Sequence, residues 1–194
     1  MIYGIYKNVR NAAWQCLIDN KITSLPVDLL RIADSAKIKI IKNSDVNILS
    51  GGESGAAFLD YDSNDWYIIY DDECNAGRRR FTIAHELGHI FLGHELVNGH
   101  HGRTINTKKP QSESQADVFA SRLLAPACVL WGLNLHKADE IANICNISKA
   151  AANVRAERMA ELYKPGKFLT SPLEKQVFEQ FRAFIEETKK HPNK

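Results

Sequence analysis

The chain has 194 residues, of which 44% are hydrophobic and 25% charged, and its formal net charge is +2 at pH 7. This length and composition are typical of a globular protein, and they exclude a chain too short to bury a hydrophobic core. No apolar run approaches membrane-spanning length, and the small net charge makes nucleic-acid binding an unfavoured function, because that needs a concentrated basic face.

The cysteines and the first residues of the chain indicate a cytoplasmic protein. No cysteine lies in a CxxC motif or close to another in sequence, so we expect reduced thiols rather than disulfides or a structural zinc site. They are Cys16, Cys74, Cys128 and Cys145. Lys7 and Arg10 fall where a signal peptide would need an unbroken apolar stretch.

The first 70 residues predict two helices followed by a small sheet. Apolar residues recur at helical spacing over residues 5–17, and Ser24 with Pro26 predicts a second helix that ends near Ala36. Three short segments have the composition of strands, namely residues 38–42, 56–61 and 66–70. The turn-rich residues 62–65 join the last two segments and predict a hairpin.

A His-Glu-x-x-His motif occupies residues 85–89, within a proline-free apolar stretch that predicts a helix over residues 79–94. Positions four apart share one helix face, so His85 and His89 can bind a single metal ion. Imidazole nitrogens suit Zn²⁺, and Glu86 on the adjoining flank can take the proton of a water that the ion activates. The motif therefore predicts a hydrolase site with Zn²⁺ as its cofactor.

A catalytic zinc ion usually has a third protein ligand, and the residues directly after the motif do not supply it. The metzincin pattern would require glycine and histidine at positions that hold Leu92 and Glu95 here. His94 is nine residues from His85, about 180° around a continuing helix, so we expect it to point away from the ligand face.

The segment of residues 113–126 contains a better third ligand. Its apolar residues repeat at helical spacing and Pro126 ends the run. Glu113 and Asp117 then lie one turn apart on the same face. This placement suits Glu113 as a metal ligand and Asp117 as the acceptor for the free imidazole N–H of a ligand histidine. Alternatively, both are ordinary surface acids in a first helical turn.

Two long motifs resemble the ImmA/IrrE family of metallopeptidases, a gluzincin-like group. They are RRRFTIAHELGHIFLGH and, further on, ESQADVFASRLLAP. The resemblance extends over residues 21–126. It implies that His85, His89 and Glu113 bind zinc, that Glu86 is the catalytic base and that Asp117 supports the site. It also implies a role in mobile elements, such as phage, and in stress responses, in which the enzyme inactivates a helix-turn-helix repressor.

Three features near the predicted site leave alternatives open. The strand at residues 66–70 either offers an edge to an extended peptide or lies inside the sheet. Residues 95–112 are polar and predict a mobile loop over the cleft. His100, His101 and Tyr163 are candidates for the donor that would stabilise the oxyanion, and the sequence does not choose among them, so the role stays unassigned.

The chain after Pro126 is predicted to be helical. Residues 138–144, a break at Cys145-Asn146, and residues 148–163 have the shape of a helix-turn-helix, which serves either packing or DNA binding. A last helix starts at Ser171 with a capping box, and its apolar stripe either closes the core or docks a partner. The stripe comprises Leu173, Val177, Phe181, Phe184 and Ile185.

These features combine into one hypothesis. The fold class is α+β and zincin-like, with a small antiparallel sheet packed on the motif helix and a helical C-terminal region. Residues 1–126 form the catalytic domain, and residues 127–194 form a helical extension packed on it as one unit. We expect a zinc endopeptidase that cleaves a protein substrate, a helix-turn-helix repressor, by water attack with Glu86 as general base. The alternatives are a zinc-loaded module that inactivates a repressor by binding alone, or a DNA-binding regulator that uses residues 138–164. The sequence does not give the oligomeric state.

Overall fold

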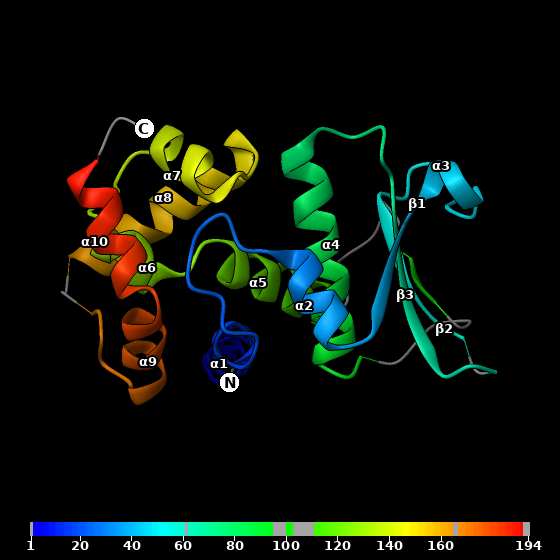
Figure 1. Cartoon of the computed structure of the whole chain (residues 1–194), viewed down its shortest axis with the longest axis horizontal. Helices are drawn as coiled ribbons and strands as arrows, with labels where there is room; N and C mark the ends of the chain where they lie inside the picture. The colour runs from blue at the N-terminus through cyan, green and yellow to red at the C-terminus, as the bar shows by residue number, and fades with distance from the viewer. Residues whose placement is uncertain (1, 61, 95–99, 103–110, 165–166, 192–194) are drawn as a thin grey trace.

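The computed structural model describes residues 2–60, 62–94, 100–102, 111–164 and 167–191, with the backbone alone for residues 2–6 and 100–102. Along its longest axis, the molecule has a small sheet at one end, a central group of helices, and a cluster of C-terminal helices at the other end (Figure 1). The combination of a small sheet with mainly helical structure confirms the predicted α+β fold class.

The sheet has four described strands in the order β1-β3-β2-β4. These strands are β1 (Ile38–Lys42), β2 (Gly55–Asp60), β3 (Asp65–Tyr70) and β4 (His100–Gly102). Strands β2 and β3 form the predicted hairpin, and β2 also pairs antiparallel with β4. The pairing of β1 with β3 is parallel, so the sheet is mixed where we expected an antiparallel one.

This topology decides one alternative and corrects one prediction about the region around the site. Strand β3 has a neighbour on each side, so it offers no edge to a peptide and is the interior strand that the sequence left open. Residues 100–102 are strand β4 instead of loop, because β2 supplies the partners for their backbone groups. The rest of the predicted mobile loop, residues 95–99 and 103–110, lies outside the described residues.

The N-terminal helices pack on the central layer. Helix α1 (Ile2–Asp19) contacts α5 (Gln111–Leu124), and α2 (Leu29–Ser35) follows it before the sheet begins. Helix α2 begins after the position that the sequence predicted, because the Asp28 side chain caps it by accepting the Arg31 N–H. A short helix, α3 (Asn43–Val46), follows β1.

Helix α4 (Ala76–Phe91) lies between the sheet and α5, and it contacts both (Figure 1). Its N-terminus is capped by Asn75, whose side chain accepts the Arg78 N–H. Residues 82–89 are all buried. On the sheet side, a Cβ added to Gly55 would lie 2.2 Å from Thr82 Cγ2 and 3.7 Å from Glu86 Cγ, so β2 approaches α4 closely at this point.

The C-terminal region consists of five described helices. They are α6 (Ala127–Gly132), α7 (Ala138–Cys145), α8 (Lys149–Tyr163), α9 (Pro172–Gln180) and α10 (Arg182–Lys190). The turn between α7 and α8 has Asn146 at φ +50°, and Ser148 caps α8 as predicted. The single last helix that we expected is instead two helices, which are divided at Phe181.

The apolar stripe of the last two helices faces the interior. Val177 and Phe181 are fully buried, Ile185 is nearly so, and all three belong to the same hydrophobic cluster as Trp14 of α1 and Leu87 of α4. This burial confirms that the stripe closes the core. Among the residues that the structure describes, no helix combines the length and apolar character needed to cross a membrane.

Candidate metal centre

The two histidines of the motif converge on one face of α4. Their side chains are 0% and 1% exposed for His85 and His89, respectively, and their Nε2 atoms lie 3.0 Å apart. Both rings are thus removed from bulk water, and the Nε2 atoms point at the same place. Four-residue spacing on a helix produces this arrangement without help from the rest of the fold.

Helix α5 brings Glu113 to the same place. Its Oε2 atom lies 3.3 Å from His85 Nε2 and its Oε1 atom 3.1 Å from His89 Nε2. Ligand atoms at about 2.0–2.2 Å from a tetrahedral Zn²⁺ are roughly 3.3–3.6 Å from one another. The donor types and their separations therefore fit a metal ion bound by two imidazoles and a carboxylate.

A close contact between the two helices makes this convergence possible. At Gly88, between the two histidines, a Cβ would lie 3.2 Å from Ala116 Cα and 3.2 Å from Phe119 Cβ. A glycine on α4 thus lets α5 approach with Ala116 against the helix backbone. Because Glu113 lies one turn before Ala116, the same approach carries its carboxylate to the histidine pair.

The protonation states of the group suit a metal site. Burial raises the pKa of Glu113, but the close approach of the His85 and His89 imidazoles outweighs this effect and holds the pKa well below the usual range. Burial also lowers the pKa of His89. An ionised carboxylate and a neutral imidazole are the forms that bind metal ions.

Asp117 lies one helical turn after Glu113 and contacts the opposite nitrogen of His85. Its Oδ1 atom is 2.9 Å from His85 Nδ1, so the carboxylate accepts the Nδ1–H hydrogen bond. This bond leaves the lone pair of His85 on Nε2, toward Glu113. The structure therefore brings Asp117 to the place that the sequence predicted for it.

Glu86 is 1% exposed and extends from α4 toward the start of β2, as its contact distance to Gly55 shows. Glu86 follows His85 in the chain, so its side chain lies beside the face of α4 that His85 and His89 share. Glu113 of α5 lies against that face. The position of Glu86 is suited to proton transfer beside a bound ion, which is the role that the motif suggests for it.

The structure brings two further residues, which the sequence did not indicate, to the site. His94 Nδ1 lies 3.1 Å from His89 Nδ1, and His94 Nε2 lies 2.9 Å from Gln115 Oε1. The prediction that His94 points away is wrong because α4 ends at Phe91. Gly93 adopts φ +65°, and the His94 N–H bonds to the His89 carbonyl, as in a Schellman turn. A glycine just after the apolar period was the available signal for this reversal.

Among the residues that it describes, the structure does not bring a candidate oxyanion donor to this centre. The Tyr163 hydroxyl donates to the Leu135 carbonyl at 3.4 Å, and its ring stacks on His136, within the C-terminal helices. The side chains of His100 and His101 lie outside the described residues. The donor stays unassigned.

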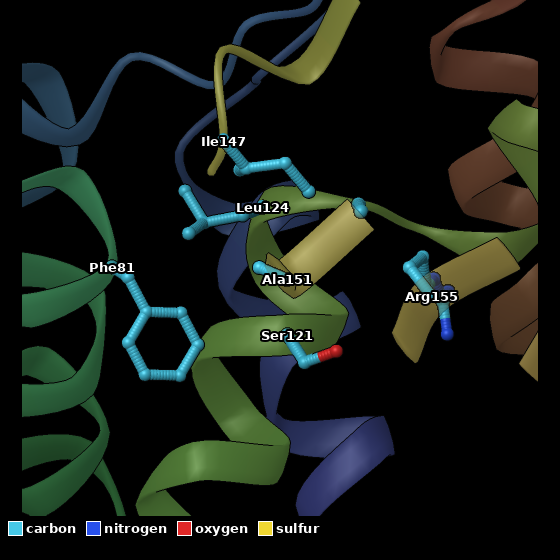
Figure 2. A pocket seen from close by; sticks show the side chains of 7 residues that line it. Phe81, Ser121, Leu124, Ile147, Ala151 and Arg155 are labelled. Atoms are coloured by element: carbon cyan, nitrogen blue, oxygen red, sulfur yellow. The ribbon is translucent and has the colours of Figure 1, made fainter. Parts of the chain in front are cut away.

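A separate small cavity lies between α4, α5 and α8. It is lined mainly by apolar side chains and by Arg155 (Figure 2). Arg155 is 2% exposed, and none of its three guanidinium nitrogens has a hydrogen-bond partner among the residues that the structure describes. Burial places the pKa of this guanidinium well below its usual value. None of the residues that line the cavity is a candidate metal ligand.

An α+β fold in which one helix supplies a His-Glu-x-x-His motif and the next supplies a glutamate defines a zincin-like chain with a candidate metal centre. The chain belongs to the family of the IrrE N-terminal-like domain, a peptidase family whose model matches residues 41–157. It is also 37% identical, over 101 residues, to the metallopeptidase ImmA of Bacillus subtilis (strain 168). That stretch covers 50% of this chain and 53% of the relative, so the chain spans about half the length of the curated relative that it matches.

Proposed function

We propose that the protein is a zinc-dependent endopeptidase. The observation that carries this proposal is the convergence of His85 Nε2, His89 Nε2 and the Glu113 carboxylate, with Glu86 beside them on α4. Membership of a peptidase family supports it, as does the similarity to a protein named metallopeptidase. Zinc is the ion proposed because two imidazoles and one carboxylate, with room for a further ligand, are typical of catalytic zinc sites.

The chain's own residues have distinct tasks in this mechanism. His85, His89 and Glu113 would hold the ion, which when bound polarises a substrate carbonyl and acidifies water. Glu86 takes the proton of the attacking water and later delivers it to the leaving amine nitrogen. Asp117 keeps the His85 ring in the orientation and tautomer that binding requires. Burial of the histidines strengthens these interactions, because little water competes for them.

We propose that the substrate is an extended protein segment that lies along β4. This strand ends the described sheet on the side of β2, and β2 approaches α4 beside Glu86 at Gly55. A peptide added to such an edge is held through its backbone, so its amide groups can be presented to the metal centre. On this proposal the peptide-binding edge is β4 and not β3, which is an interior strand.

The proposed substrate is a helix-turn-helix repressor, which places the enzyme in the cytoplasm. This part rests on the family resemblance of the two motifs. The alternative hypothesis, that residues 138–164 bind DNA, is less favoured because the start of α8 packs on α4. A Cβ on Gly77 of α4 would lie 2.5 Å from the Ser148 nitrogen, and Ala152, Arg155 and Met159 of α8 are buried.

Replacement of Glu86 by glutamine tests cleavage. Glu86→Gln keeps the size of the side chain and leaves the three ligands in place, so we expect it to retain zinc and fold. It removes a general base that contributes roughly 10²- to 10⁴-fold to rate. The wild type and the variant are each co-expressed with a helix-turn-helix repressor encoded beside the gene. Repressor fragments and repressor-controlled transcription are then measured.

Fragments with the wild type alone would support the peptidase. If both proteins relieved repression equally and the repressor stayed intact, the non-cleaving, zinc-loaded binding module would be the function instead. An exposed substitution, Glu157→Gln on α8, is the matched control for the change of a carboxylate to an amide.

A further inference from the structure

The side chain of His94 lies between Gln115 and the metal-site residue His89. Gln115 is on α5, two residues after Glu113, and its Oε1 atom is 2.9 Å from His94 Nε2. On the other side, His94 Nδ1 is 3.1 Å from His89 Nδ1. The three side chains therefore form a chain of hydrogen bonds from α5 to a nitrogen of His89 that faces away from Glu113.

The chemistry of these groups sets the direction of each hydrogen bond. The amide oxygen of Gln115 only accepts, so Nε2 of His94 carries the hydrogen. A neutral imidazole then has its lone pair on Nδ1, and His94 accepts through it. The donor in that contact is consequently the Nδ1–H of His89. This leaves the lone pair of His89 on Nε2, 3.1 Å from Glu113 Oε1.

The reverse direction is incompatible with metal binding. If the Gln115 amide were turned so that its NH₂ group donated to His94 Nε2, the hydrogen of His94 would move to Nδ1. His89 Nδ1 would then accept, and the hydrogen of His89 would occupy Nε2, where the ion has to bind. Only the first direction presents two Nε2 lone pairs to the same point, because Asp117 fixes the His85 lone pair on Nε2 in the same way.

The backbone holds His94 in this position. The turn at Gly93 brings the His94 N–H 3.0 Å from the carbonyl oxygen of His89, so both the main chain and the ring of His94 bond to the same residue. The two rings meet edge to face, with centroids 4.9 Å apart and an interplanar angle of 75°. Contacts with His89 therefore hold the residues that follow the last turn of α4.

We propose that His94, oriented by Gln115, is a positioning residue that fixes the tautomer of His89 as a metal ligand. It does for His89 what Asp117 does for His85, with a neutral acceptor in place of a carboxylate. The inference rests on the proposed zinc site. It assigns His94 no contact with substrate.

Zinc affinity of the purified full chain provides the first test. Dissociation constants for Zn²⁺ are measured by competition with a chromophoric chelator for the wild type, His94→Phe and Gln115→Met. His94→Phe keeps a ring but removes the acceptor, so affinity should fall roughly 10- to 100-fold, as is typical when such a supporting contact is lost. His136→Phe is the matched control, because His136 is exposed and stacks on Tyr163 among the C-terminal helices. It should bind zinc like the wild type.

The double variant tests whether Gln115 acts through His94. If both belong to one hydrogen-bond chain, His94→Phe/Gln115→Met should bind zinc no more weakly than His94→Phe alone. Additive losses would instead mean that Gln115 acts elsewhere. Full wild-type affinity in His94→Phe, with Glu113→Ala losing zinc, would overturn the inference while leaving the metal site intact. A wild-type chain that binds no zinc would overturn the proposed function instead.

A second test needs no variant and therefore does not depend on the variants folding. Imidazole ¹H–¹⁵N correlation spectra of the zinc-loaded wild type report which nitrogen of each ring carries hydrogen. We expect hydrogen on Nε2 of His94 and on Nδ1 of His89. A hydrogen on Nδ1 of His94 would overturn the proposal directly.

Discussion

Gly77, in the first turn of α4, lies against the backbone of Ser148, so close that a Cβ on Gly77 would come within 2.5 Å of the Ser148 nitrogen and 2.9 Å of the Ile147 carbonyl carbon. The helix that carries His85, Glu86 and His89 is thereby packed on the turn between α7 and α8. At the other end of the C-terminal region, the Gln180 side chain donates to the carbonyls of Leu17 and Ile22 at 2.8 and 2.7 Å. We propose that residues 1–126 and residues 127–194 fold as one cooperative unit.

Gly77→Ala tests this coupling. The added methyl group meets backbone atoms, which cannot rotate away, so we expect the free energy of unfolding to fall by about 1–3 kcal/mol. Unfolding in urea should remain a single transition when followed by fluorescence and by circular dichroism. Gly51→Ala is the control, since nothing lies within 4 Å of its Cβ position. Two separate transitions in the wild type would show that the two parts unfold independently.

The candidate metal centre predicts metal content and a stability that depends on metal. The wild type should bind about one zinc ion per chain, and free zinc at 100 times its dissociation constant should stabilise the fold by about 2.7 kcal/mol. Glu113→Ala should lose this stabilisation as His85→Ala does. Metal analysis and thermal unfolding with and without a chelator measure both effects. Retention of full zinc affinity by Glu113→Ala would remove it from the ligand set.

Two substitutions of Asp117 test whether its carboxylate supports His85 as a metal ligand. Asp117→Ala removes the acceptor for His85 Nδ1–H, so zinc affinity or turnover should fall roughly 10- to 100-fold while the fold persists. Asp117→Asn retains an amide oxygen as acceptor, and we expect a smaller loss. Titration with zinc and circular dichroism distinguish loss of metal from loss of structure. Unchanged zinc affinity and turnover in Asp117→Ala would mean that Asp117 is an ordinary surface acid with no role in the metal centre.

Arg155 gives a prediction on stability that is independent of the metal. An unpaired buried guanidinium is costly, whereas methionine has a similar length without charge. Arg155→Met should therefore raise the free energy of unfolding, by roughly 1–3 kcal/mol, measured by urea denaturation. Arg158→Met, an exposed change of the same type on α8, is the control. A loss of stability in Arg155→Met would show that the guanidinium has a partner beyond the described residues, such as a bound anion.

The parts of the site that the sequence predicted depend on geometry within one helix. The spacing of His85 and His89 sets their common face, and the spacing of Glu113 and Asp117 sets theirs. The sequence did not indicate that Gly88 would let α5 approach α4, which joins the two faces. His94 was misplaced because the prediction extended the helix beyond Gly93, where the backbone reverses direction.

The differences in the fold come from pairing and packing between distant segments. The parallel alignment of β1 with β3 is decided by the path of the chain between them, which no pattern within either strand records. Strand β4 has only three residues and depends on β2 for its partners. The break at Phe181 was hidden because the apolar residues of α9 and α10 continue one helical period across it.

Strand β4 belongs to the connection that carries the chain from α4 to α5, and these are the two helices that bear the candidate metal ligands. If a peptide binds along β4 as proposed, a substitution in that strand changes the surface on which the peptide lies. It leaves His85, His89 and Glu113 anchored in their own helices. On the proposed function, peptide preference and metal binding therefore depend on different segments of the chain, so one can change in evolution without the other.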